Sequence, residues 1–198
     1  MTTRIFAAVF PPQQVIDGLE EYIGPRREAD DRLRWVWPEQ WHLTTLFIEH
    51  CPDRSLDGLL EGLAELAART RPFAVRLGGG GCFPDPFAVR VLYLGVGNGA
   101  DSLHALSKTG RALASSTGAP PDGTRFVPHL TVARTRTRFD GNRWLGILDS
   151  FGSFDWEATE LRVIRSHRGE GPRRRSRYEL LAALPLAGDA LPAADAGD

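Results

Sequence analysis

The chain has 198 residues, of which 42% are hydrophobic and 25% are charged, and its formal net charge is −1. These values are ordinary for a globular domain with an apolar core, and the near-neutral charge argues neither for nor against a nucleic-acid partner. No apolar stretch is long enough to span a membrane, and the apolar run near the N-terminus is too short for a signal peptide. Cys51 and Cys82 match neither a disulfide framework nor a metal-binding spacing, so we expect a reduced, cytoplasmic protein.

Strand and helix patterns alternate along the chain. Strands are expected where branched and aromatic residues gather, and helices where apolar residues recur every three or four positions. Pro11 and Pro12 end the first apolar run and open a helix, since proline is tolerated in a first helical turn. In chain order we predict a strand at 4–10, a helix at 13–23, a short strand and a turn from 33, a strand at about 41–48, a helix at 55–69, strands at 73–77 and 89–96, a helix at 100–116, a strand at 127–135, a short helix at 141–150 and strands at 158–167 and 177–186.

Residues 78–87 contain four consecutive glycines and are predicted to form a loop. A phosphate cradle is not predicted there, because the run lacks a Gly-Lys-Ser/Thr ending and no helix follows it. Residues 187–198 are expected to form a disordered tail after a single domain that covers residues 1–186.

The tripeptide His-Leu-Thr occurs twice, at 42–44 and at 129–131, each time in a predicted strand. Strand side chains alternate between faces, so each His and its Thr share a face, with Cα atoms about 6.6 Å apart. Each half of the sequence carries one copy. The repetition suggests an α+β fold of two related lobes that face each other across a cleft.

Two imidazoles and two hydroxyls that converge on one space suit a phosphodiester. The hydroxyls of Thr44 and Thr131 can donate hydrogen bonds to its nonbridging oxygens. One neutral imidazole can take a proton from attacking water, and the other, as imidazolium, can give a proton to the departing oxygen, because the ordinary histidine pKa makes both forms accessible. In-line displacement needs these two groups on opposite sides of the phosphorus. Each proton transfer typically contributes about 10²–10⁴ in rate, and the scheme needs no metal and no other cofactor.

Two simpler interpretations apply to the same histidines. A single His in an apolar strand is most often a packed, hydrogen-bonded residue, although the repetition of the whole triplet argues against this. Two histidines on separate strands could also bind a metal ion. No acidic or cysteine partner stands at a matching spacing, so no metal site is predicted.

At these residues the chain resembles the two-histidine (2H) phosphoesterase superfamily, whose sequence signature is a pair of His-x-Thr-x motifs. Within it, the chain is similar to the bacterial and archaeal RNA 2′,3′-cyclic phosphodiesterases of the LigT/ThpR family. The similarity covers residues 4 to about 186. It is carried by the segments RIFAAVFPP (4–12), RWVWPEQWHLTTLF (34–47), GGGCFPDPFAVRVLYLGV (79–96) and FVPHLTVAR (126–134).

The resemblance implies a bilobal two-histidine phosphoesterase fold, with two pseudo-symmetric antiparallel-sheet lobes, outer helices and a central cleft. It also implies metal-independent hydrolysis of a 2′,3′-cyclic phosphate to a 2′-phosphomonoester. The substrate would be a cyclic phosphate end of RNA or a cyclic nucleotide. The resemblance also implies that His42 donates a proton to the departing 3′ oxygen, that His129 accepts a proton from water, and that Thr44 and Thr131 hold the phosphate. The residues alone leave the two histidine roles interchangeable. No membrane and no obligate protein partner are expected.

Arg134 and Tyr178 are further candidate substrate contacts, because each matches the family pattern. Strand alternation places Arg134 on the face opposite His129, so its guanidinium reaches the phosphate only if the strand bends or ends there. The arginines at 165–177, which include the cluster at 173–175 and 177, could follow an RNA backbone, although a charge run is more often a solvated loop.

Two other features of the first motif carry alternatives. Trp35, Trp37 and Trp41 could stack on a base, although large aromatic residues beside a strand more often belong to the core. Thr45 stands where the family usually has an apolar residue. It is expected to point away from the histidine face and to affect packing rather than chemistry.

Three functions fit the sequence. Hydrolysis of RNA 2′,3′-cyclic phosphate ends is the leading hypothesis. A second is 2′–5′ joining of RNA ends, the same chemistry reversed with a ribose hydroxyl in place of water, which dilute aqueous conditions disfavour. A third is a non-catalytic RNA-binding or nucleotide-binding protein. The intact histidines and threonines argue against the third, because binding alone does not need two proton-transfer groups.

Overall fold

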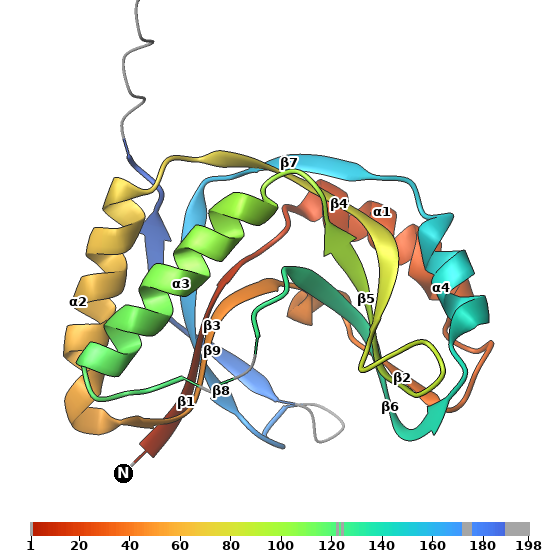
Figure 1. Cartoon of the computed structure of the whole chain (residues 1–198), viewed down its shortest axis with the longest axis horizontal. Coiled ribbons are helices and arrows are strands. Elements are labelled where there is room, and N and C mark those ends of the chain that lie inside the picture. The colour runs from red at the N-terminus through yellow and green to blue at the C-terminus, as the bar shows by residue number, and fades with distance from the viewer. Residues whose placement is uncertain (1, 122, 124, 172–175, 189–198) are drawn as a thin grey trace, which may run out of the picture.

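The computed structural model describes residues 2–121, 123, 125–171 and 176–188, which form the predicted α+β fold (Figure 1). Most of the predicted tail, from residue 189 on, and the arginines at 173–175 lie outside these described residues. The strands are β1 (Thr2–Val9), β2 (Leu33–Trp35), β3 (Leu43–Pro52), β4 (Phe73–Phe83), β5 (Val89–Val96), β6 (His129–Phe139), β7 (Phe154–Ala158), β8 (Glu160–His167) and β9 (Arg177–Pro185). The helices are α1 (Gln13–Ile23), α2 (Asp53–Arg69), α3 (Ala100–Ser116) and α4 (Asn142–Asp149), with single 3-10 turns η1 (Gly24–Arg26) and η2 (Pro38–Gln40).

The strands form one curled antiparallel sheet in the order β7-β4-β5-β6-β3-β1-β8-β9, with β2 paired to β6. At the centre of this order, β3 and β6 are joined by a single residue pair, Leu43 with Leu130. All other neighbouring strands pair over at least three residues. The sheet therefore consists of two arms, and these arms are the two predicted lobes.

Each lobe has its own pair of helices (Figure 1). Helices α2 and α3 pack against each other and against β9 and β3, whereas α4 packs on β4 and β5 and α1 packs on β7. The chain passes from one lobe to the other several times, since β1 and β3 belong with β8 and β9. The two halves of the sequence are thus not the two lobes, although each lobe does carry one His-Leu-Thr strand.

Amphipathic spacing explains how the helices pack against the sheet. On α2 the buried residues Leu59, Leu63 and Ala67 recur every four positions and form one stripe. The central strand β1 lies between β3 and β8, and its residues from Ile5 to Val9 are all buried. No helix among the described residues is long and apolar enough to cross a membrane.

The prediction of a loop at 78–87 is wrong over its first part, because residues 78–83 continue strand β4. The glycines allow close packing rather than disorder. A Cβ on Gly80 would lie 2.7 Å from the carbonyl oxygen of Leu145 and 2.8 Å from Cβ of Leu148, both on α4. The backbone N–H of Gly80 also donates to the carboxylate of Asp149 at 2.7 Å. A residue without a side chain is therefore what lets β4 touch α4 here.

Strand β7 has no counterpart among the predicted elements. It pairs with the outer edge of β4 in register from Phe73–Ala158 to Leu77–Phe154. Its exposed Asp155 and Glu157 alternate with partly buried Phe154 and Trp156. Five residues are too few for such an alternation to stand out from a loop in the sequence alone.

The contact of Gly80 with α4 yields a test of this packing. Gly80→Ala should lower the free energy of unfolding by about 1–3 kcal/mol, because the new methyl group meets helix backbone that cannot change rotamer. Urea denaturation would measure the change. Gly97→Ala is the control, since its Cβ would meet no atom within 4 Å. An equal loss of stability in both variants would contradict the packing argument.

Candidate active site

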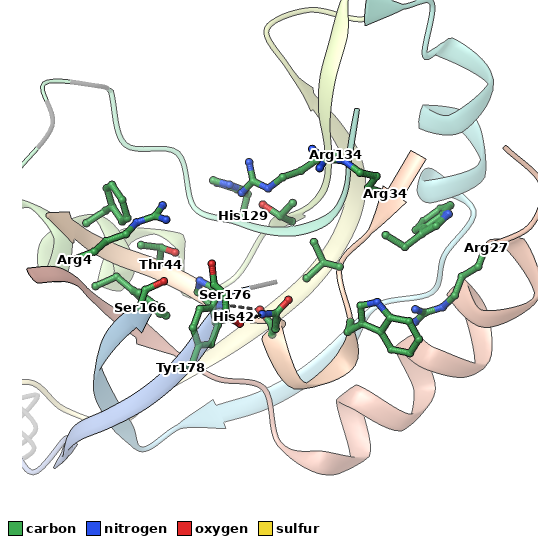
Figure 2. A pocket seen from close by; sticks show the side chains of 17 residues that line it. Arg4, Arg27, Arg34, His42, Thr44, His129, Arg134, Ser166, Ser176 and Tyr178 are labelled. Carbon is green, nitrogen blue, oxygen red and sulfur yellow. Dashed lines mark hydrogen bonds between the residues drawn. The ribbon is translucent and has the colours of Figure 1, made fainter. Parts of the chain in front are cut away.

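A cavity of about 850 Å³ lies between the two lobes. All six residues singled out from the sequence as site residues line it: His42, Thr44, His129, Thr131, Arg134 and Tyr178. Figure 2 shows His42 with Tyr178 on one side of the cavity and His129 with Arg134 on the other. The structure therefore brings together side chains from strands that are far apart in the chain.

The single residue pair between β3 and β6 explains why the two triplets meet. Leu43 and Leu130, the middle residues of the triplets, are opposite each other and are both buried. Because strand side chains alternate, the flanking His and Thr residues turn to the other face, toward the cavity. The antiparallel register around this pair sets Thr44 on the side of His129 and His42 on the side of Thr131.

Each imidazole is oriented in the same way by the backbone. Nδ1 of His42 lies 2.7 Å from the carbonyl oxygen of Gln40, and Nδ1 of His129 lies 2.7 Å from that of Val127. A carbonyl oxygen can only accept, so Nδ1 carries the proton and donates it in both cases. Nε2 is left as the nitrogen that can act in the cavity, as an acceptor when the ring is neutral and as a donor when it is charged.

Aromatic side chains surround His42. Its ring stacks on Phe6 with centroids 4.7 Å apart, lies 5.5 Å from the ring of Phe10, and meets the edge of Tyr178 at 5.8 Å. Burial lowers the pKa of His42 to about 4, against the opposing effect of the hydrogen bond to Gln40, and the charge of Arg134 lowers it further. Without a bound anion, His42 is therefore a neutral imidazole at pH 7.

His129 has a similar but less enclosed environment. Its ring lies 5.1 Å from the rings of both Phe83 and Tyr93. Burial lowers the pKa of His129 below the ordinary histidine value, the hydrogen bond to Val127 raises it, and the charge of Arg134 lowers it. Both imidazoles are thus held uncharged for the same physical reason, which is loss of solvent.

The cavity is strongly cationic. Four arginines line it (Arg4, Arg27, Arg34 and Arg134), and no Asp or Glu does so among the described residues. Arg4 pairs with Glu49 at 3.2 Å and Arg27 pairs with Glu20. Such a wall is complementary to a phosphate or to another anion with several oxygen acceptors.

Arg134 lies on the same face as the second triplet, contrary to the alternation expected from the sequence. Between β5 and β6, Tyr93 pairs with Thr131 whereas the adjacent Leu92 pairs with Ala133. One extra residue on β6 is thus a bulge, where Val132 and Ala133 are both buried. The bulge reverses the alternation and turns Arg134 into the cavity, so the strand does bend at the required place.

The other residues of the first motif divide between core and cavity. Trp41 is buried in the core, whereas Trp35 and Trp37 line the cavity. Thr45 is buried and its hydroxyl donates to the carbonyl oxygen of Ala7 at 3.1 Å, so it serves packing as expected. Gln40, which accepts from His42, also donates through its side-chain amide to the carbonyl oxygen of Ser176 at 2.9 Å.

Three cavity arginines were not predicted from the sequence. Arg4 and Arg34 belong to predicted strands, and Arg27 follows the first helix. The sequence signal was weak, because an isolated arginine in a chain with 24 cationic residues does not stand out. Nothing in the sequence shows that β2 pairs with β6, which is what brings Arg34 next to Arg134.

The described residues contain no group of three or more His, Cys, Asp or Glu side chains arranged to hold a metal ion. The two free cysteines lie apart from each other in the fold, Cys51 at the end of β3 and Cys82 near the end of β4. Outside the cavity, His167 interacts with a carboxylate, since its Nε2 lies 2.7 Å from the carboxylate of Glu179.

Comparisons with known proteins agree with this geometry. The family model of the 2′-5′ RNA ligase superfamily matches residues 11–170. An RNA 2′,3′-cyclic phosphodiesterase of Thermus thermophilus is 32% identical over 94% of this chain and 91% of its own length, and one of Aquifex aeolicus is 29% identical over 81% and 85%. A crystal structure of a Thermus thermophilus protein superposes with a TM-score of 0.77 at 26% identity, over 94% of this chain and 100% of that one. The resemblance noted from the two motifs is therefore confirmed, and the chain belongs to the 2′-5′ RNA ligase superfamily, whose members are two-histidine phosphoesterases.

Proposed function

We propose that the protein is an RNA 2′,3′-cyclic phosphodiesterase that hydrolyses cyclic phosphate ends to 2′-phosphomonoesters without a metal ion. The observation that carries this proposal is the pair of imidazoles, each tied at Nδ1 to a backbone carbonyl, in one arginine-lined cavity. The names of the curated relatives support the same activity.

The chemistry assigns one step to each histidine. Neutral His129 takes a proton at Nε2 from water while the water oxygen bonds to phosphorus. The bond between phosphorus and O3′ breaks, and protonated His42 gives its Nε2 proton to that oxygen. The product carries a 2′-phosphate and a free 3′ hydroxyl. Exchange of protons with solvent then restores both histidines, so the reaction balances with one water consumed.

The surroundings of His42 suit the role of acid. An imidazolium stacked on Phe6 is unfavourable in the empty cavity, because burial removes its water. The negative charge of the substrate phosphate compensates for this cost, so the charged form is favoured when substrate is bound. A proton held in this way is readily lost to a departing oxygen.

Four further side chains would hold the substrate. The hydroxyls of Thr44 and Thr131 donate to nonbridging oxygens, and each such hydrogen bond to a charged group is typically worth about 1.5–3 kcal/mol. Arg134 supplies a positive charge next to His129. Tyr178, whose ring contacts both Phe6 and His42, contacts the substrate on the side of the departing oxygen.

The first prediction concerns the two histidines. His42→Ala and His129→Ala should each lower kcat by about 10²–10⁴, because each removes one proton transfer. The assay is hydrolysis of a short RNA with a 2′,3′-cyclic phosphate end in the presence of EDTA, with the phosphate position of the product determined. Turnover by the unaltered protein should survive the chelator and yield only the 2′-phosphate.

His50→Ala is the matched control for this experiment, since His50 is an exposed histidine on the same strand β3 and does not line the cavity. It should retain activity. Loss of turnover in EDTA would contradict the metal-free mechanism. Binding without turnover would favour a non-catalytic RNA-binding protein, and joining of RNA ends in preference to hydrolysis would favour a ligase.

A second prediction concerns pH. The reaction needs one neutral and one protonated imidazole, and kcat/KM reports their pKa values in the free protein. Both values are lowered by burial, so kcat/KM should be greatest below pH 6.5 and should fall as the pH rises above it. The bound phosphate stabilises imidazolium and raises both values, so the kcat profile should be displaced to higher pH. A kcat/KM profile that declines only above pH 8 would contradict the assignment of both limbs to buried histidines.

A further inference from the structure

The cavity is larger than the reaction at one phosphate requires. Beyond the histidines it continues between β2 and the segment after η1, where Arg27, Arg34, Trp35 and Trp37 also line it. In Figure 2, Arg27 lies at the end of the view opposite to Arg4 and Ser166. A volume of about 850 Å³ is in the upper part of the range for sites that enclose drug-sized ligands. There is therefore room for more than the terminal nucleotide.

Arg34 and Arg134 form an unusual pair in this part of the cavity. They are directly opposite each other in the antiparallel pairing of β2 with β6, so their side chains leave the same face. Residues in such positions have Cβ atoms about 4.5–5.5 Å apart, and like charges there are destabilising. Neither arginine has an ion pair with a carboxylate in the part of the chain that the structure describes. A phosphate held between the two guanidinium groups would remove this repulsion.

Trp37 provides an aromatic surface in the same part of the cavity wall. The guanidinium of Arg27 lies 5.0 Å from the centroid of its ring and is itself paired with Glu20. This cation–π contact helps to hold the indole in place at the wall. Nucleobases stack on such aromatic surfaces with little dependence on sequence.

Two described arginines of the β8–β9 region, Arg168 and Arg177, offer a weaker alternative path for RNA. Arg168 pairs with Glu49 at 2.7 Å, and Arg177 pairs with Glu170 at 2.9 Å. Each of these two guanidinium groups has a carboxylate partner, and Arg168 shares Glu49 with Arg4. Among the described arginines that line the cavity, Arg34 and Arg134 are the two without a carboxylate partner.

We propose that Arg34, Arg134 and Trp37 form a second subsite, which binds the nucleotide on the 5′ side of the cyclic phosphate. The two arginines hold the internucleotide phosphate and Trp37 stacks on the preceding base. This inference rests on the proposed function, which locates the cyclic phosphate between the histidines. It identifies the substrate class as RNA ends of at least two nucleotides rather than free cyclic mononucleotides.

Three substrates separate the parts of this subsite. The first is a nucleoside 2′,3′-cyclic phosphate, the second is the same compound with a 5′-phosphate, and the third is a dinucleotide with a 2′,3′-cyclic phosphate end. The unaltered protein should show increasing kcat/KM in this order. The step to the second substrate measures the phosphate contact, and the step to the third measures base stacking.

Two variants assign these steps to residues. Arg34→Gln should lower kcat/KM about ten-fold for the second and third substrates relative to the first. It should also reduce the slope of log kcat/KM against log salt concentration for the dinucleotide by about 0.7, the value for one phosphate contact on a single strand. Trp37→Ala should lower kcat/KM about ten-fold for the dinucleotide relative to the second substrate, because only the dinucleotide has a base to stack.

Arg136→Gln is the matched control, because Arg136 is an exposed arginine two positions further on β6 and does not line the cavity. This variant should leave the kcat/KM values of the three substrates, relative to one another, unchanged. The subsite proposal is overturned if the unaltered protein treats the three substrates alike, or if Arg34→Gln lowers kcat/KM equally for all of them.

Failure of the proposed function would be recognised separately, as no hydrolysis of any substrate. In that case the subsite is tested by binding alone, from the affinities for a nucleoside 2′-phosphate and for a dinucleotide with a 2′-phosphate end. Tighter binding of the dinucleotide that is lost in Arg34→Gln supports the subsite, and equal binding overturns it.

Discussion

The arrangement of this molecule depends on one residue pair, Leu43 with Leu130, at the centre of the sheet. It is the only pairing between β3 and β6 among the described residues, and both side chains are buried. Because side chains alternate along a strand, burying these two leucines turns the histidine and threonine on either side of each toward the cavity. A shift of either strand by one residue would bury the histidines and expose the leucines, so hydrophobic packing itself sets the register of the site.

The cavity formed in this way has a cost in stability that its proposed ligand would offset. Arg34 and Arg134 face each other with like charge, and burial together with the charges of Arg4 and Arg34 lowers the pKa of Arg134. Two imidazoles are held neutral nearby for lack of solvent. The like-charge pair and the imidazolium form of either histidine are unfavourable, and the negative charge of a phosphate would compensate for both. Residues that lower stability in this manner tend to occur at functional sites.

Much of the fold and site followed from sequence patterns, and the failures have particular causes. The helices and most strands were predicted because their apolar spacing is regular, and the two triplets were found because they repeat. Residues 78–83 were mistaken for a loop, since their strand conformation comes from pairing with β5 and glycine has little strand preference of its own. Arg134 was placed on the wrong face, because the bulge after Thr131 arises from pairing with β5 and not from any local signal.

By itself, the sequence determined the fold class, the two His-Leu-Thr strands and the four groups that the proposed chemistry needs, because these depend on local spacing and on residue type. The tertiary structure decided the remainder. Only the pairing of β2 with β6 places Arg34 opposite Arg134, and only the folding of the segment after η1 sets Arg27 against Trp37. Such contacts come from how the strands pair and the segments between them fold, and no local sequence pattern predicts either.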